Sequence, residues 1–232
     1  MTEIYFIRHG QASFGSDNYD CLSNLGIRQA ELLGDYFART GIHFQAVYSG
    51  SLKRQIDTAN IVTKRLDHAA TPALCITDKF DEFDAEAMIT PQIDDMVRED
   101  PSLATAAAGF ESDFDAYKLL FDRAIKRMMD GRSNVSKSLE TFINAIRKGI
   151  DQVVRENGTS KKAAVFTSGG TISAVMQLAL NLSLDETVHL GWEIYNTSVS
   201  IFNYRKERLD LKTFNSVAHL QLKQDPDLIT YL

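Results

Sequence analysis

The sequence is poor in the features that mark secreted, membrane-spanning and zinc-binding proteins. Its 232 residues include two cysteines, Cys21 and Cys75, which are too few for a disulfide framework. No group of cysteines and histidines has the spacing of a zinc site, so we expect no metal. The longest stretch that leans apolar, Ile172 to Leu180, is far too short to span a bilayer.

A leader segment and a block of basic charge are also missing. The first strand begins at once, without a charged segment that leads into an apolar one, so we expect no signal peptide. The few cysteines fit a reducing compartment, and we predict a cytoplasmic location. The net charge of −6 is spread along the chain, which argues against partners such as nucleic acid or a membrane surface. A small anionic ligand is still compatible, because a pocket can be positive in an acidic protein.

What is present is enough apolar sequence for a full core. With 44% hydrophobic residues, we expect one domain over residues 1–232. Apolar strand segments alternate with helical ones, which predicts a three-layer α/β sandwich with a mainly parallel central sheet. Residues 85–137 interrupt this alternation, with breaks at Pro91 and Pro101 and an amphipathic helix from Phe110 to Met129. We expect this segment to be a helical insertion that caps the site.

The first expected strand leads into three residues suited to phosphate chemistry. Ile4 to Ile7 is continuously apolar, as in a strand buried on both faces, and Arg8, His9 and Gly10 follow it. Open α/β sheets bind ligands at this carboxyl edge. Arg8 offers a fork of donors to an anion, and His9 can be a neutral nucleophile near pH 7. Gly10 lets the backbone approach a ligand closely.

The loop that follows is a further candidate for phosphate contacts. Gln11 to Cys21 is rich in turn-forming residues. It can present backbone N–H groups and the hydroxyl of Ser13 or Ser16 to a phosphate. An ordinary connecting loop is an equal alternative. Ser23 then fits the N-cap of a helix that runs to about Arg39.

A second arginine follows the next expected strand, Ala46 to Ser49. Ser51 can cap the helix after it, and Arg54 then lies in the first turn. Helix N-termini attract phosphate through free N–H groups and the helix dipole, and an arginine there adds a charge-assisted fork. By residue type alone, Arg54 also fits an exposed helix position.

Two further segments supply a candidate acid and a candidate anion site. Asp81, Glu82 and Asp84 follow a short expected strand, and any of them can serve as a general acid or lie in an acidic surface loop. Spacing alone does not choose among them. The strand from Ala163 to Thr167 runs into Ser168-Gly169-Gly170, where a helix N-terminus offers backbone N–H groups to an anion.

These segments together resemble the histidine phosphatase superfamily, in its phosphoglycerate-mutase-like branch. The resemblance covers nearly the whole chain and rests on Ile4–Gly10, Leu22–Ala30, Ser49–Ala59 and Thr167–Gly170. It implies a small phosphorylated substrate, and neither a metal nor a cofactor. The insertion is where members of the family usually set substrate choice.

The resemblance also implies roles for individual residues. It makes His9 the nucleophile of a phosphomonoesterase that works through a phosphohistidine. Arg8 and Arg54 hold the phosphate, with Ser168, Gly169 and Ser16 as further phosphate contacts. Glu82 is the residue that matches the family's proton donor.

One position departs from the family pattern, which has Ser or Thr and then His-Gly-Gly after the strand. Ser168 stands where the second catalytic histidine is expected. Loss of one such donor costs about 10²–10³ in rate, although a serine hydroxyl still donates. A phosphate-binding protein that has lost catalysis is therefore an alternative to the phosphatase. A phosphoglycerate-mutase-type phosphotransferase is the least favoured, because it needs a stable phosphoenzyme and a closed pocket.

The remaining histidines are weaker candidates for that missing role. His43 and His68 lie on connections away from the strand edges, and His189 precedes Gly191-Trp192. His219 lies in a segment that resembles the family's C-terminal Ala-His-Leu, where the histidine has a structural role. The sequence identifies neither the substrate nor the oligomeric state. A homodimer is compatible with it.

Overall fold

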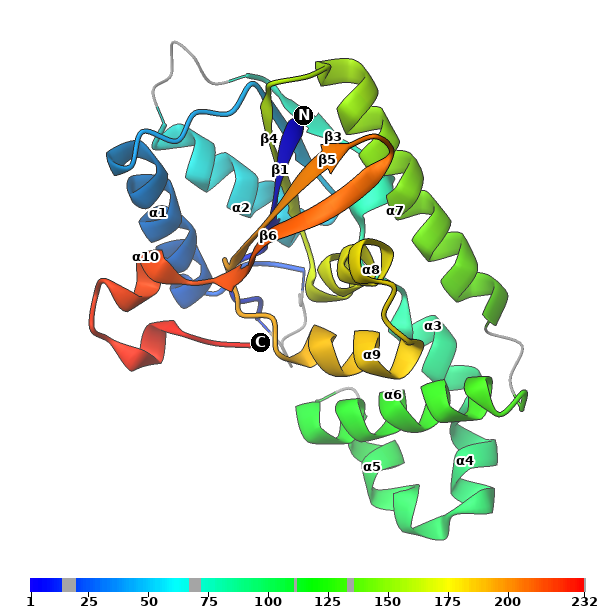
Figure 1. The fold of residues 1–232 in the computed structure, drawn as a ribbon. Coiled ribbons are helices and arrows are strands. Elements are labelled where there is room, and N and C mark those ends of the chain that lie inside the picture. Colours follow the sequence, from blue (N-terminus) through cyan, green and yellow to red (C-terminus); the bar gives the residue numbers. More distant parts are fainter. Residues whose placement is uncertain (14–19, 67–71, 111, 133–135, 232) are drawn as a thin grey trace. The chain divides into compact units, whose positions relative to one another are not determined.

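The computed structural model describes residues 1–13, 20–66, 72–110, 112–132 and 136–231 (Figure 1). The chain forms two compact units. The first is built from Met1–Ser13, Asn18–Glu82 and Ala145–Leu232, and the second contains Phe83–Asn144. The second unit is therefore inserted into the chain of the first, directly after Glu82.

The first unit contains a six-stranded sheet with the strand order β3-β2-β4-β1-β5-β6. The four strands β3, β2, β4 and β1 are parallel, whereas β5 and β6 are antiparallel to their neighbours. The strands are β1 (Thr2–Arg8), β2 (Ala46–Ser49), β3 (Leu74–Ile76), β4 (Lys162–Thr167), β5 (Val199–Arg205) and β6 (Arg208–Ser216). The predicted α/β fold with a mainly parallel sheet is confirmed.

Helices of the first unit cover both faces of this sheet (Figure 1). They are α1 (Asn24–Arg39), α2 (Lys53–Lys64), the last part of α7 (Ser136–Asn157), α8 (Gly169–Leu180), α9 (Leu184–Trp192) and the short α10 (Ala218–Gln221). Ser23 caps α1 as predicted, because its Oγ accepts a hydrogen bond from the N–H of Gly26.

Strand β1 lies in the core and is buried on both faces. Tyr5 and Ile7 pack into a cluster with side chains of α1 and α2. On the other face, the ring of Phe6 contacts those of Phe80 and Phe202, with centroids 6.1 and 5.7 Å away. Burying each such side chain stabilises the fold by roughly 1.5–3 kcal/mol. The end of β1, where His9 follows, is therefore rigidly placed.

The second unit is helical throughout its described residues. Its helices are α3 (Ala85–Ile89), α4 (Ile93–Glu99), α5 (Ala104–Gly109), α6 (Phe114–Met129) and the first part of α7. The buried side chains of Met88, Met96 and Leu120 contribute to its core. Helix α6 begins four residues later than expected, because the Asp113 carboxylate caps it through the N–H groups of Asp115 and Ala116.

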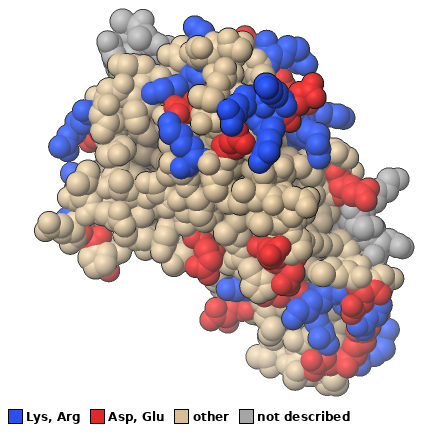
Figure 2. All heavy atoms as spheres, in the orientation of Figure 1, with Lys and Arg blue, Asp and Glu red and all other residues tan. Residues whose placement is uncertain are grey.

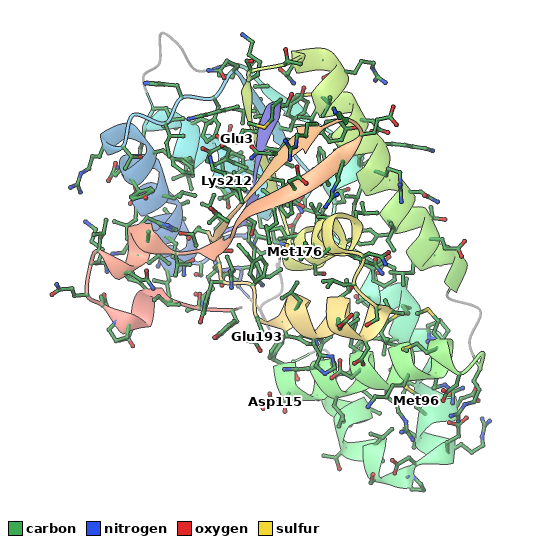
Figure 3. All side chains as sticks on the ribbon, in the orientation of Figure 1. Glu3, Met96, Asp115, Met176, Glu193 and Lys212 are labelled. Atoms are coloured by element: carbon green, nitrogen blue, oxygen red, sulfur yellow. The ribbon has the colours of Figure 1, made fainter. Side chains whose placement is uncertain are left out.

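Charges of both signs are mixed on the β5–β6 hairpin of the first unit (Figure 2). Arg205 pairs with Asp210 across the hairpin at 2.8 Å. Lys212 on β6 reaches Glu3 on β1 at 2.5 Å, and Figure 3 labels both residues. Three of the basic residues of this hairpin, Arg205, Arg208 and Lys212, thus lie within ion-pair distance of carboxylates. Across the described part of the chain, no helix combines the length and the apolar character that a membrane span requires.

Candidate active site

His9 follows β1 directly and is held by the neighbouring strand. Its backbone N–H donates to the carbonyl of Thr167 at the end of β4, at 2.8 Å, and the residue is 4% exposed. The ring atom Nδ1 lies 2.7 Å from the carbonyl oxygen of Gly10. Because a carbonyl can only accept, Nδ1 carries the proton in this hydrogen bond. The lone pair of the neutral ring is therefore on Nε2.

Arg54, in the first turn of α2, faces that lone pair. Its Nε–H donates to Nε2 of His9 at 3.2 Å, and Arg54 is 7% exposed. Burial, followed by the charges of Arg54 and Arg8, holds the pKa of His9 well below its usual range. The hydrogen bond to Gly10 acts in the opposite direction but does not outweigh them. His9 is therefore a neutral imidazole at neutral pH, as a nucleophile requires.

Asp20 holds the other end of the Arg54 side chain. Its Oδ1 lies 2.8 Å from Nη1 of Arg54, and its two oxygens also accept the backbone N–H groups of Lys53 and Arg54. One carboxylate thus caps α2 and fixes its first arginine. Asp20 was not among the site residues predicted from the sequence. The available signal was an acidic residue near the end of the loop that leaves the Arg8-His9 edge.

The predicted cap of α2 by Ser51 is wrong. The N-cap position is Leu52, whose side chain makes no capping hydrogen bond. Ser51 instead donates through its N–H and its hydroxyl to Asp81, at 2.5 and 2.6 Å. A carboxylate is a stronger acceptor for the free N–H groups of a helix than a hydroxyl, and Asp20 supplies it.

The three candidate carboxylates have different partners. Asp81 binds Ser51, and Asp84 caps α3 by accepting the N–H of Ala87 at 2.9 Å. Glu82 Oε2 accepts the N–H of Gly170 at 3.0 Å, in the first turn of α8. Of these three carboxylates, only that of Glu82 therefore contacts the start of α8, which follows the end of β4. Spacing could not distinguish the three carboxylates, and the role of Glu82 as proton donor stays a prediction from the family resemblance.

Hydroxyl groups of β4 and α8 place the segment that carries Glu82. Thr167 Oγ1 donates to the carbonyl of Phe80, and Thr171 Oγ1 donates to that of Asp81, both at 2.6 Å. The fit around Glu82 is close, because a Cβ on Gly170 would lie 2.2 Å from Glu82 Oε1. Position 170 thus needs a glycine as long as the carboxylate stays in place.

Ser168 is fully buried between β4 and α8. It is the N-cap residue of α8, yet its side chain makes no capping hydrogen bond. Instead its Oγ accepts a hydrogen bond from Nε2 of Gln55 at 2.8 Å. Gln55 follows Arg54 on α2 and is also fully buried. Gln55 was not among the site residues predicted from the sequence, although it follows Arg54 in the first turn of a predicted helix.

Arg8 and Gly169 lie on the same side of the site. A Cβ on Gly169 would lie 3.6 Å from Nε of Arg8, so the guanidinium runs beside the first residue of α8. Nη1 of Arg8 donates to the carbonyl of Ile194. The structure therefore brings six of the predicted site residues to the carboxyl ends of β1 and β4 and the N-termini of α2 and α8. These six are Arg8, His9, Arg54, Glu82, Ser168 and Gly169. Ser16 lies outside the described residues.

The other described histidines have positions unlike that of a second catalytic histidine. His43 and His189 are exposed. His219 is buried, and its Nε2 is 2.9 Å from the hydroxyl of Thr197. That hydroxyl donates to the carbonyl of Asn196, so it accepts from His219. His68 lies outside the described residues, and within the described ones no cluster of three His, Cys, Asp or Glu could hold a metal.

Through Thr197, His219 supports the backbone of His9. The N–H of Thr197 donates to the carbonyl of His9 at 3.2 Å, and the Asn196 amide donates to the same carbonyl at 3.3 Å. His219 therefore supports His9 indirectly, through Thr197.

The comparison of the sequence with protein families agrees with this geometry. The family model of the histidine phosphatase superfamily (branch 1) matches residues 4–217. The chain belongs to the histidine phosphatase superfamily.

Two curated relatives of this histidine phosphatase family member share the same description. The serine/threonine-protein phosphatase Pgam5, mitochondrial, of Caenorhabditis elegans is 34% identical over 124 residues, which are 52% of this chain and 40% of that protein. The chain thus aligns with less than half the length of this curated relative. A Caenorhabditis briggsae protein with the same description is 40% identical over 63 residues, 27% of this chain and 22% of its own length.

Solved structures share the fold over nearly the whole chain. An Entamoeba histolytica phosphoserine phosphatase mutant in complex with phosphoserine has a TM-score of 0.65 at 19% identity, with 95% of this chain and 100% of that chain covered. A phosphoglycerate mutase from Bacillus anthracis has a TM-score of 0.65 at 20% identity, with 97% of each chain covered. At these identities the likeness establishes the fold.

Proposed function

We propose that this chain is a metal-independent phosphomonoesterase that forms a phosphohistidine at His9. The observation that carries the proposal is the state of the His9 ring, whose proton is held on Nδ1 by Gly10 and whose Nε2 lone pair faces a cation. Family membership and the phosphatases among its relatives support the same reaction. The substrate would be a small phosphorylated compound.

The first step would transfer the phosphoryl group to His9. The Nε2 lone pair attacks phosphorus in line, and the bond between phosphorus and the leaving oxygen breaks. Glu82 gives its proton to that oxygen. Arg8 and Arg54 stabilise the equatorial oxygens, so that the positive charge comes from side chains and no cofactor is needed.

The second step would return the site to its starting state. Glu82, now a carboxylate, removes a proton from water, and the hydroxide oxygen forms a new bond to phosphorus. The bond from phosphorus to Nε2 breaks, and inorganic phosphate leaves. Throughout both steps the Gly10 carbonyl keeps the proton on Nδ1, so Nε2 is regenerated as a lone pair.

Ser168 favours a second candidate function, a phosphate-binding protein without turnover. A neutral hydroxyl stabilises a developing negative charge less well than a charged imidazole does. The presence of His9 with an unprotonated Nε2, and of Glu82 at the N-terminus of α8, supports turnover instead, because binding alone needs neither. A phosphoglycerate-mutase-type activity has the least support.

We also propose that the inserted unit, Phe83–Asn144, selects the substrate. Its chain leaves the first unit directly after Glu82, so its first residues are covalently tied to the proposed proton donor. The cytoplasmic location stays a prediction from the sequence, and the oligomeric state stays open.

The test is phosphate release from a panel of phosphomonoesters between pH 4.5 and 7.5, with wild type and His9→Ala side by side. We expect wild type to release phosphate and His9→Ala to be inactive. Rapid acid-free quenching followed by intact mass measurement should show a phosphorylated wild type only. His43→Ala, which changes an exposed histidine, is the control. Phosphate binding without release from any ester would support the binding protein.

A further inference from the structure

We infer that Gln55 is a positioning residue, which fixes the hydroxyl of Ser168 as a hydrogen-bond donor to the phosphoryl group. The inference rests on the proposed function and assigns a partner to the position where that function is most in question. It is carried by the hydrogen bonds of two fully buried side chains on α2 and α8.

The orientation of the Gln55 amide is fixed by the backbone. Nε2 lies 3.3 Å from the carbonyl oxygen of Phe80 and 2.8 Å from Ser168 Oγ. A carbonyl can only accept, so the nitrogen and not the oxygen of the amide must face Phe80. The second N–H of the same nitrogen then points at Ser168, which receives it.

This fixes the role of the Ser168 hydroxyl. Because Oγ accepts from Gln55, its own O–H is left to donate elsewhere. Among the residues that the structure describes, none accepts a hydrogen bond from it. The backbone around Ser168 borders the site on each side: Thr167 binds the N–H of His9, and Gly169 lies beside Arg8. A phosphoryl oxygen held by the arginines is the acceptor that this donor lacks.

Gln55 also lowers the stability of the fold in a way that an apolar side chain in the same space would not. Its Oε1 is buried and has no hydrogen-bond partner among the described residues. An unsatisfied buried amide oxygen destabilises a protein, and an apolar side chain of the same length would avoid that cost. A Cβ on Gly50 would lie 1.9 Å from Oε1, so the chain keeps a glycine where this side chain passes.

The test is a double-mutant cycle with Gln55→Met, which keeps the length but removes the donor, and Ser168→Ala. The probes are p-nitrophenyl phosphate for kcat and KM, and orthovanadate for a dissociation constant. We expect each single variant to lower kcat about tenfold with KM changed less than twofold, as for the loss of one hydrogen bond. The double variant should be no slower than Ser168→Ala alone, because Gln55 acts through the hydroxyl.

Gln92→Met is the matched control. Gln92 is also a buried glutamine with an unpartnered Oε1, and its Nε2 donates to a backbone carbonyl of the second unit. It should leave the vanadate dissociation constant unchanged. Where Gln55→Met does not fold, Gln55→Glu replaces it. Its loss in kcat should shrink as pH falls, because only the protonated carboxyl can donate to Ser168.

The outcomes separate this inference from the proposed function. Losses of Gln55→Met and Ser168→Ala that multiply in the double variant would overturn the inference, as would an equal loss in all pH conditions for Gln55→Glu. Full activity in His9→Ala would overturn the proposed function. If wild type hydrolyses none of the esters, the same cycle is read from the vanadate dissociation constants, where additivity again contradicts the inference.

Discussion

The Nε–H of Arg54 donates to Nε2 of His9 across 3.2 Å, so the arginine proposed to hold phosphate contacts the proposed nucleophile. Asp20 holds the far end of the same guanidinium at 2.8 Å. In the proposed reaction, a bound phosphate would therefore draw the Nε–H of Arg54 from His9 to its own oxygens. That exchange would free the lone pair of His9 when a substrate is bound.

The low pKa of His9 predicts activity at acid pH. Burial and the charges of Arg54 and Arg8 lower it, so the acid limb of kcat/KM that reports on His9 should lie well below pH 6.5. Arg54→Gln removes one of these charges and should move the limb to higher pH, besides lowering kcat/KM at least 100-fold. A pH–rate profile of both proteins measures this. An acid limb near 6.5 in wild type would contradict it.

The two buried histidines predict a loss of stability in acid. Burial lowers the pKa of His219 to about 3, and that of His9 is also depressed, whereas both take up protons near pH 6.5 when unfolded. The unfolded state thus binds more protons below pH 6.5, and the free energy of unfolding should fall by about 1.4 kcal/mol per pH unit for each histidine.

The variant His219→Gln tests this pH dependence, because it removes one of the two buried histidines that take up a proton on unfolding. Between pH 6.0 and 5.0 its free energy of unfolding should depend on pH about half as steeply as that of wild type. Urea unfolding at several pH values measures the slopes, with His43→Gln as an exposed control. Equal slopes in wild type and His219→Gln would mean that the ring is protonated inside the folded protein.

Placing a histidine at position 168 without a second change should lower the proposed activity. Ser168 is fully buried and its Oγ is 2.8 Å from the Gln55 amide, so an imidazole there would collide with that side chain. We expect Ser168→His to lower kcat at least tenfold, and the added Gln55→Ala to recover most of the loss. Steady-state kinetics of the three proteins would decide, and a rise in Ser168→His alone would show room that the packing does not indicate.

Gly170→Ala should disable the proposed proton donor without removing it. The new Cβ would lie 2.2 Å from Glu82 Oε1, which forces the carboxylate away from α8. We expect kcat to fall about 100-fold for esters with poor leaving groups and much less for p-nitrophenyl phosphate, whose leaving group needs less protonation. Gly109→Ala, where the nearest side chain is 3.6 Å away, is the control. Equal losses for both kinds of ester would argue against Glu82 as the acid.

Asp20→Asn should tighten the binding of a dianion. Asparagine still caps α2, so the fold should lose less than about 1 kcal/mol, while a negative charge 2.8 Å from Arg54 disappears. We expect a several-fold lower dissociation constant for orthovanadate, measured by titration calorimetry. Asp57→Asn, which removes an exposed partner of Lys53, serves for comparison. Weaker binding would show that Asp20 acts mainly by holding Arg54 in place.

The sequence predicted those site residues whose placement is local. Arg8 and His9 end a buried strand, and Arg54 lies in the first turn of a helix, so neighbouring residues suffice to place them. Ser51 shows where local rules fail, because a carboxylate from a distant loop replaces the expected cap. Local capping preferences do not include acceptors supplied by tertiary contacts.

The contacts that sequence reasoning missed join distant segments. Asp20 and Arg54 are 34 residues apart, and Gln55 and Ser168 are 113 apart. No periodicity or motif on either partner points to the other, since each pair forms only when two elements dock. Spacing could not separate Glu82 from Asp81 and Asp84 for the same reason, because the partner of Glu82, Gly170, lies 88 residues further along the chain.

The order of the sheet has a consequence for how this chain folds. Strand β4 pairs with β1 in parallel, with Glu3 opposite Lys162 and Arg8 opposite Thr167, and it also separates β1 from β2. Closing such a long loop before any contact rewards it makes folding slow. During synthesis, β4 can enter between its neighbours only after Thr167 has left the ribosome. Premature termination or cleavage ahead of residue 162 should therefore leave β1 and β2 as unpaired, aggregation-prone edges rather than a weakened enzyme.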